Sequence, residues 1–270
     1  MQPFLSIIIP TYNRQILVSH TIDSTLQFIR HADCGIEIIV VDDASDDGTF
    51  EFLQNRCMHE ITSGAVKLIR NRKNLGVTGA KNTGAANSKG KWLLFIDSDD
   101  LLIPDAAQEL LDTLKTFDSF PIIFFRCRSL ETGELTGPYY EKPYTLAFKD
   151  FLNIGTPGEC LPVVRASAFE QCPYYSELRG CEGLAYARII RRFGPARVEA
   201  LVAREYRTDN NDRLCSGKGI IRRACYLAKY NNILLTEFKR ELYVTTIFKT
   251  IMKLIYYQWH CFLNNLKDSE

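Results

Sequence analysis

The chain has 270 residues, 46% of them hydrophobic, so it can bury one large core, or one core with a small appendage. Its 33 basic and 32 acidic residues leave a net charge of +1, and we expect no nucleic-acid partner. This balance conceals an asymmetry, because residues 218–267 hold nine basic and two acidic residues, a charge of +7 that leaves −6 for the remainder.

The nine cysteines are odd in number and form no CxxC pair, so neither a disulfide framework nor a zinc site is indicated. We expect all of them to be reduced thiols in a cytoplasmic protein. No basic, apolar leader precedes the first apolar run, and no window of about 18 uninterrupted apolar residues occurs, so we expect neither a signal peptide nor a membrane-spanning helix. Membrane contact would then be peripheral.

The first hundred residues alternate between strand-like and helix-like segments. Short apolar runs that end in polar turns, as buried strands of a parallel sheet do, occupy residues 5–9, 36–41, 66–69 and 92–96. Between them we predict a helix at 15–30, a second that carries Phe50 and Leu53 inward, and a small-residue helix around 79–86.

The second half is less regular. Further strands are predicted at residues 122–126, 161–164 and 198–206, and helices at 104–116, 166–171 and 181–193. From residue 220 the chain is predicted to be helical to about 238, and again from about 240 to 266. The pattern indicates an α/β fold, with a doubly wound, mostly parallel sheet over residues 1–216 and a C-terminal helical segment over 217–270.

Polar residues follow three of the predicted strands. They are Thr11, Tyr12, Asn13 and Arg14 after the first, Asp42 and Asp43 after the second, and Asp97, Ser98, Asp99 and Asp100 after the fourth. Parallel strands end at one edge of a sheet, so these residues are expected to line one crevice. Neither GxGxxG nor a Walker A loop is present, and a divalent cation held by Asp99, with help from Asp97, would neutralise the phosphates of a nucleotide. The alternative is a solvated acidic turn that caps the next helix.

Four motifs, IIIPTYNR, IIVVDDASDDGT, NLGVTGAKNTG and WLLFIDSDD, occur in this order within residues 5–101. Together they closely resemble the family 2 glycosyltransferases, inverting enzymes of the GT-A fold that use nucleotide sugars. The donor-binding residues expected in the four motifs are Thr11, Tyr12, Arg14, Asp43, Lys81, Asp97, Ser98 and Asp99. The resemblance implies that Thr11, Tyr12 and Asp43 hold the uracil ring, whereas Asp42 fixes the loop.

The same resemblance implies that Asp97 and Asp99 bind the sugar nucleotide together with Mn²⁺ or Mg²⁺. Lys81 is expected near the nucleotide, at a position where many relatives carry arginine. Its contact there would differ, because lysine is a point charge and cannot make the planar fork of a guanidinium group.

The catalytic base of this family usually lies in a Glu-Asp pair at the start of a helix. This chain has one carboxylate at such a place, Glu182, and Gly194 ends the helix that follows. Glu182 is therefore expected to deprotonate the acceptor hydroxyl as it attacks the anomeric carbon, so that an α-linked donor gives a β-linked product. Otherwise Glu182 would only interact with the helix dipole, and Glu177 or Glu159 would be the next candidates.

The segment YRTDNNDRL at residues 206–214, with the DSDD cluster, resembles a subset of bacterial enzymes that build O-antigen repeat units and often transfer glucose or galactose. This resemblance implies a UDP-sugar donor and a sugar acceptor linked to a lipid diphosphate. Arg207 and Arg213 are candidates for a basic group over the donor diphosphate, although a solvated loop would have the same composition.

Two other classes of function are compatible with an α/β sheet of this kind. An inactive transferase-like scaffold is disfavoured by the intact Asp97, Asp99 and Glu182. A nucleotidyltransferase is disfavoured because no glycine-rich, basic loop follows the first strand.

The last predicted helix repeats apolar residues at four-residue spacing, at Ile247, Ile251, Ile255 and Trp259. The pattern is typical of a helix docked on a domain. The positive charge of the segment also suits the inner face of a bacterial membrane, a peripheral location useful for a lipid-linked acceptor. In that interpretation the residues that meet the lipid are Arg222, Arg223, Lys249 and Lys253.

Overall fold

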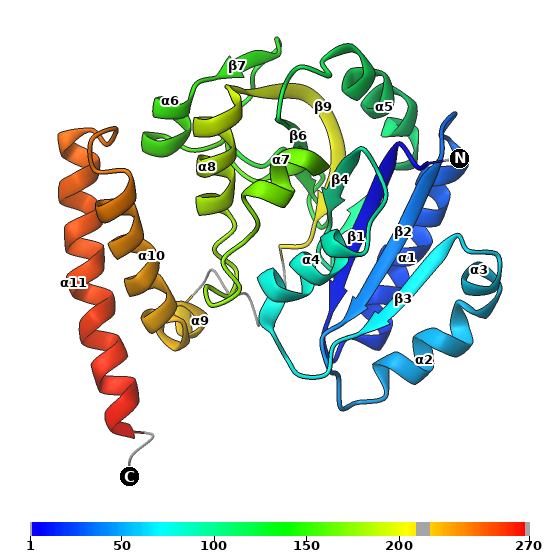
Figure 1. Ribbon diagram of the computed structural model, residues 1–270, viewed down its shortest axis with the longest axis horizontal. Helices are drawn as coiled ribbons and strands as arrows, with labels where there is room; N and C mark the ends of the chain where they lie inside the picture. Colours follow the sequence, from blue (N-terminus) through cyan, green and yellow to red (C-terminus); the bar gives the residue numbers. More distant parts are fainter. Residues whose placement is uncertain (1, 209–216, 268–270) are drawn as a thin grey trace.

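The computed structural model describes residues 2–208 and 217–267, and shows a β-sheet with helices on both faces (Figure 1). The strand order is β3-β2-β1-β4-β8-β6-β9-β5, and β7 pairs with β9. A parallel block consists of β1 (Leu5–Thr11), β2 (Ile36–Asp42), β3 (Val66–Arg70) and β4 (Trp92–Phe95). The α/β fold and its parallel central strands are thus as predicted.

Beyond β4 the sheet is mixed. The strand β8 (Cys160–Arg165) is antiparallel to both β4 and β6 (Ile122–Ser129), whereas β6 and β9 (Ala196–Tyr206) are parallel. Two strands missed by the sequence analysis, β5 (Leu101–Leu102) and β7 (Tyr144–Leu146), pair antiparallel with β9. They are two and three residues long, too short to show an alternating pattern.

Helices cover both faces of the sheet because its central strands are apolar on both sides. Ile7 and Ile9 of β1 belong to the core on one face and Ile8 to the core on the other. The first face is covered by α1 (Gln15–Arg30), α2 (Thr49–Arg56) and α5 (Ala107–Thr116), with α3 (Met58–Thr62) after α2 and the 3-10 turn η1 (Pro104–Ala106) before α5. The second face is covered by α4 (Gly76–Ala86), α7 (Ala166–Gln171) and α8 (Gly183–Phe193), with α6 (Phe148–Asn153) beside α8.

The C-terminal part comprises α9 (Gly217–Arg222), α10 (Ala224–Glu237) and α11 (Val244–Lys267). We call α10 and α11 the hairpin; they lie side by side at the left edge of Figure 1. Phe238 at the end of α10 is fully buried in a cluster with Leu184 of α8. Arg188 donates two hydrogen bonds to the carboxylate of Glu237, each 2.8 Å long. The hairpin therefore packs on the sheet domain through α10.

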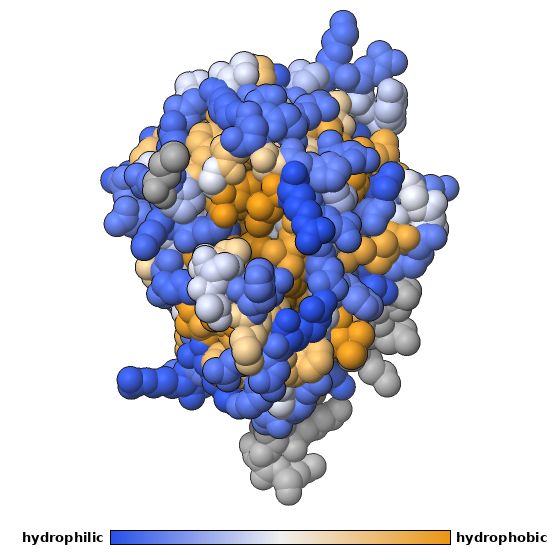
Figure 2. All heavy atoms as spheres, turned by 90° about the vertical axis from the view of Figure 1, so that its right-hand side faces the viewer, coloured by the Kyte–Doolittle hydropathy of each residue, from blue (hydrophilic) through white to orange (hydrophobic). Residues whose placement is uncertain are grey.

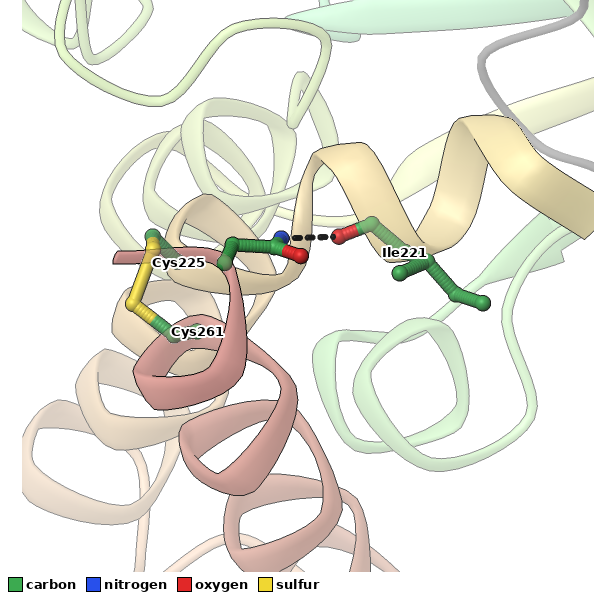
Figure 3. Close-up of a disulfide and its surroundings, with 4 residues drawn as sticks. Ile221, Cys225 and Cys261 are labelled. Atoms are coloured by element: carbon green, nitrogen blue, oxygen red, sulfur yellow. Dashed lines mark hydrogen bonds between the residues drawn. A yellow bond between two sulfur atoms is a disulfide. The ribbon is translucent and has the colours of Figure 1, made fainter. Parts of the chain in front are cut away.

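Cys225 of α10 and Cys261 of α11 form a disulfide (Figure 3). Beside it, Asn264 Nδ2 donates to the carbonyl oxygen of Ile221 over 2.9 Å. The expectation of nine reduced thiols is wrong for this pair, because the packing of the two helices brings Cα atoms 36 residues apart in sequence to within 4.8 Å. No pattern among neighbouring residues of the sequence predicts such a contact. The other cysteines among the described residues are Cys34, Cys57, Cys127, Cys160, Cys172 and Cys181.

The face of the molecule at the right of Figure 1, on the side of β3, α2 and α3, is mostly hydrophilic, with hydrophobic side chains gathered toward its middle (Figure 2). Among the helices that the structure describes, none has the length and apolar character needed to cross a bilayer.

Candidate active site

A cavity of about 390 Å³ lies at the carboxyl ends of β1, β2 and β4, and its size is typical of a small-molecule site. The predicted residues that line it are Thr11, Tyr12, Arg14, Asp43, Asp97, Ser98, Asp99, Glu182 and Arg207. Lys81 lies beside the cavity, and Arg213 falls outside the described residues. The structure thus brings together residues from both halves of the sequence.

The loops after β1 and β2 are fixed to each other and to the start of α4. The backbone N–H of Asp43 donates to the carbonyl oxygen of Thr11 over 2.8 Å. The buried carboxylate of Asp43 accepts hydrogen bonds from the backbone N–H of Gly76 (2.7 Å) and from Asn71 Nδ2 (2.7 Å). Asp42, fully buried, accepts from the backbone N–H of Ser45 over 3.2 Å. Both aspartates therefore hold loops, a role that the sequence analysis gave to Asp42 alone.

Thr11 and Tyr12 present different surfaces to the cavity. The side chain of Thr11 is buried, and its Oγ1 has no hydrogen-bond partner among the residues that the structure describes. Leaving a buried hydroxyl unpaired costs free energy, so this atom suits a polar ligand group. Tyr12 is 42% exposed and offers an aromatic face to a planar ring.

Lys81 lies between two carboxylates of the site. Its Nζ is 2.9 Å from Asp97 Oδ1 and 3.0 Å from Glu182 Oε1, and its side chain is only 7% exposed. Burial alone would lower the pKa of Lys81, but Asp97 and Glu182 outweigh it and raise the pKa, so the ammonium group keeps its charge. Burial would likewise raise the pKa of Asp97, but the charge of Lys81 outweighs it and lowers the pKa.

Two arginines form ion pairs with the other carboxylates of the DSDD cluster, residues 97–100. Arg14 Nη1 lies 2.7 Å from Asp99 Oδ2. Asp100 is buried, and Arg204 Nη1 lies 3.2 Å from its Oδ2. Burial raises the pKa of Asp100 to about 7, against the opposing charge of Arg204. Arg207 donates its backbone N–H to Asp100 Oδ1 over 3.1 Å, which joins the end of β9 to the loop after β4.

Asp97 and Asp99, the carboxylates expected to bind a metal ion, both line this cavity, as do Asp43, Asp100 and Glu182. Within the described part of the chain, no cluster of three or more His, Cys, Asp or Glu side chains could hold a metal by itself. Mg²⁺ is commonly bound by one or two carboxylates together with phosphate oxygens of a substrate. The two aspartates therefore fit a cation that a nucleotide diphosphate also binds.

Of the three carboxylates considered as the base, Glu182 is the one placed in this cavity. It stands at the N-terminus of α8, where it is 22% exposed and held by Lys81. Glu177 is half-exposed and 3.5 Å from Lys229, and Glu159 lines a separate cavity beside the hairpin.

Arg179 and Arg223 also line the cavity, and the sequence analysis predicted neither. Arg223 is buried, and its Nη2 donates to the carbonyl oxygens of Arg179 (2.6 Å) and Gly180 (2.8 Å), just before Glu182. The assignment of Arg223 to the membrane surface is therefore wrong, because the junction of α9 and α10 turns it toward this loop. Partners more than 40 residues apart leave no local signal.

Gly76 explains how Arg179 reaches the cavity. Its backbone is left-handed, with φ of 77°, and a Cβ at this position would lie 2.6 Å from Arg179 Cγ. Only glycine avoids both conflicts. The Asn-Leu-Gly turn of the third motif was the available sequence signal.

Comparison with known sequences agrees with the motifs. The model of the family described as "Glycosyl transferase family 2" matches residues 6–172. The chain is 31% identical over 195 residues to the Campylobacter jejuni GalNAc(5)-diNAcBac-PP-undecaprenol beta-1,3-glucosyltransferase, covering 70% of this chain and 60% of that protein. It is 35% identical over 100 residues to the Escherichia coli UDP-Glc:alpha-D-GlcNAc-diphosphoundecaprenol beta-1,3-glucosyltransferase WfgD, covering 37% and 36% of the two chains. It therefore spans 60% or less of either relative's length.

Solved structures give the same fold. Staphylococcus aureus TarS 1-349 in complex with UDP-GlcNAc superposes with a TM-score of 0.65 at 14% identity, over 87% of this chain and 67% of that one. The mannosyltransferase PcManGT from Pyrobaculum calidifontis, in complex with GDP-Man and Mn²⁺, superposes with a TM-score of 0.62 at 16% identity, over 96% of this chain and 74% of that one. At such identities the likeness establishes the fold alone, and it agrees with the predicted GT-A architecture.

Proposed function

The chain belongs to glycosyl transferase family 2, and from this membership we propose that it is an inverting hexosyltransferase. The donor would be a UDP-sugar, with glucose or galactose as the hexose, and the acceptor a sugar carried on a lipid diphosphate. The names of the two relatives support this choice, because each specifies β-1,3-glucosyl transfer to a sugar on diphosphoundecaprenol. The product would be a β-linked unit of an O-antigen or another surface polysaccharide.

The observation that carries the proposal is the carboxylate of Glu182 at the cavity, held by Lys81, which also binds Asp97. In the reaction, Glu182 accepts the proton of the acceptor hydroxyl while the hydroxyl oxygen forms a bond to the anomeric carbon. The bond from that carbon to the diphosphate oxygen breaks, and UDP leaves with the electron pair. Attack from the opposite face inverts the configuration.

The donor would be bound at the strand ends. Thr11 and Tyr12 face the uracil ring, and Asp43 keeps the adjoining loop in place. Arg207 and Arg179 supply positive charge near the diphosphate, where negative charge grows as the bond breaks. A Mn²⁺ or Mg²⁺ ion, when bound by Asp99 and Asp97, would neutralise part of the same charge.

We further propose that the enzyme works at the inner face of the cell membrane. A lipid-linked acceptor resides there, and a peripheral protein can reach its sugar from the cytoplasm. In this arrangement residues 1–216 form the catalytic domain and residues 217–270 the membrane-proximal segment.

The proposal is tested by the release of UDP from a panel of UDP-sugars, with and without Mn²⁺ and a short sugar-diphosphate-lipid analogue. We expect acceptor-dependent release with UDP-glucose or UDP-galactose by the wild type, and its loss in Glu182→Gln. No acceptor-dependent release with any donor would leave the inactive scaffold as the better account.

A further inference from the structure

The helix α11 exposes a continuous apolar surface. We define its outer face as Phe248, Met252, Ile255, Trp259 and Phe262, which are 66%, 52%, 57%, 60% and 55% exposed. These residues follow one another at steps of four and three, so they form a single stripe along the helix. The stripe differs from the one expected at uniform four-residue spacing, because steps of four alone drift around an α-helix. Ile247, the first residue of that expected stripe, is half-buried.

The hairpin docks on the rest of the molecule without this face. Its contacts run mainly through α10, which lies between α11 and α8 in Figure 1, and through the fully buried Phe238. The residues of α11 that line the cavity shared with the sheet domain are Thr246, Lys249, Thr250 and Lys253, none of which belongs to the outer face. The inner side of α11 is tied to α10 by the Cys225–Cys261 disulfide (Figure 3). A continuous apolar surface that is exposed in this way marks an interaction site, whereas single apolar residues scattered over a surface are normal.

The charge of α11 identifies the partner. Its 24 residues include three lysines and no acidic residue. We propose that the outer face of α11 binds an anionic lipid bilayer and lies in the plane of the membrane surface, with the apolar stripe in the acyl region and Lys249 beside the head groups. This inference rests on the proposed function, which puts the acceptor in that membrane, and it names the surface that makes the contact.

A second copy of the chain is the main competing partner, since steps of four and three are also those of a coiled coil. Paired helices of that kind usually carry opposite charges at the positions that flank the stripe. Here the flanking residues are Lys249, Ile251, Tyr256, Gln258 and Leu263, so two copies would gain no ion pair. Trp259 and Tyr256, by contrast, are the side chains that favour a lipid interface.

The chain contains a built-in probe of this contact. Its two tryptophans are Trp92, which is fully buried, and Trp259, which is 60% exposed. Vesicles of phosphatidylglycerol and phosphatidylcholine should shift the emission of Trp259 to shorter wavelength and shield it from acrylamide, while Trp92 contributes a constant background. In Trp259→Phe the shift should disappear while sedimentation with the vesicles persists.

The matched variants are Phe248→Glu/Ile255→Glu on the outer face and Met58→Glu/Tyr139→Glu on surfaces elsewhere. The second pair makes the same charge change at side chains that are 59% and 73% exposed. We expect the first pair to weaken sedimentation with these vesicles by about tenfold or more and the second to leave it near wild type. All four sites are exposed, and retained UDP binding would show that the fold is intact.

Equal sedimentation of the wild type and Phe248→Glu/Ile255→Glu would overturn the inference, as would an unchanged emission of Trp259. A concentration-dependent dimer that the same variant dissociates, without vesicle binding by the wild type, would assign the face to a second copy. Vesicle binding is measured without donor or acceptor, so a failure of sugar transfer counts against the proposed activity and not against this contact.

Discussion

The carboxyl edge of the sheet and the outer face of α11 depart from an ordinary folded protein in opposite directions. At the sheet edge, charged side chains are buried, and Lys81 and Asp100 each contact a group of opposite charge. On α11, large apolar side chains such as Phe248 and Trp259 are exposed. Buried charges and exposed apolar stripes are both informative, and the difference indicates a small polar ligand at the first region and an extended apolar partner at the second.

The largest expected effect is a loss of sugar transfer, without any loss of vesicle binding, when the metal-binding carboxylate is changed. Asp99→Asn should reduce sugar transfer by about a thousandfold, because the variant would no longer hold the cation that neutralises the leaving diphosphate. Removal of divalent ions with a chelator should have a similar effect, reversed by Mn²⁺. Vesicle sedimentation should stay at the wild-type level. Asp105→Asn, on the exposed η1 turn, is the control. Full transfer in excess chelator would exclude the metal.

The second-largest effect is expected for Glu182→Gln, which removes the proposed catalytic base. The amide keeps the size of the side chain but cannot accept a proton, so turnover should fall by about a hundredfold. UDP affinity and vesicle binding should change little. Glu177→Gln, at a half-exposed glutamate outside the cavity, should be near wild type in all three measurements. Equal turnover of wild type and Glu182→Gln would exclude Glu182 as the base.

Lys81→Met tests whether the buried ammonium group holds the site in its working charge state. The pKa of Asp97 is raised by burial but lowered overall by Lys81, so without the lysine that pKa should rise. The acid limb of the pH dependence of turnover should therefore shift to higher pH, by about one pH unit or more. Lys81→Arg keeps the charge and should leave the limb close to its wild-type place. An unmoved limb in Lys81→Met would contradict the electrostatic role.

The smallest expected effect concerns the contact between the hairpin and the sheet domain, made by Arg188 and Glu237. Burial would raise the pKa of Glu237, but hydrogen bonds from Arg188 outweigh it and lower the pKa. The pair therefore stabilises the fold above the ordinary pKa of 4.5, and this stabilisation is lost as the pH falls from that value through the lowered pKa of the folded state. Glu237→Gln should lower the free energy of unfolding by about 1 kcal/mol at pH 7. Urea titrations at pH 7 and pH 4 measure it, and an equal loss at both would contradict the ionic interpretation.

The sheet edge was largely predictable from sequence because its signals are local. The helix at residues 15–30 has the predicted bounds, and strands two and three end within a residue of the prediction. Asp43, Asp97 and Asp99 lie in one cavity because parallel strands end together, a rule that needs no knowledge of side-chain contacts.

The remaining features depend on contacts between distant residues. The disulfide, the packing of Arg179 over Gly76 and the hydrogen bonds of Arg223 each join segments separated by more than 30 residues. Arg204 beside Asp100 is of the same kind, since β9 and the loop after β4 meet only in the folded sheet. Composition and periodicity describe neighbours along the chain, so they could not place these partners.

Arg223 has a consequence for how the molecule unfolds. Its guanidinium group joins the start of the hairpin to the loop that precedes Glu182, and Phe238 shares a core with Leu178 and Leu184 on either side of that loop. The hairpin and the loop that carries the base therefore constitute one cooperative unit, so that loosening one loosens the other. Truncating the chain before α9 would remove Arg223 along with α11. Point substitutions on α11 are thus the cleaner way to detach the enzyme from lipid while its catalytic geometry is preserved.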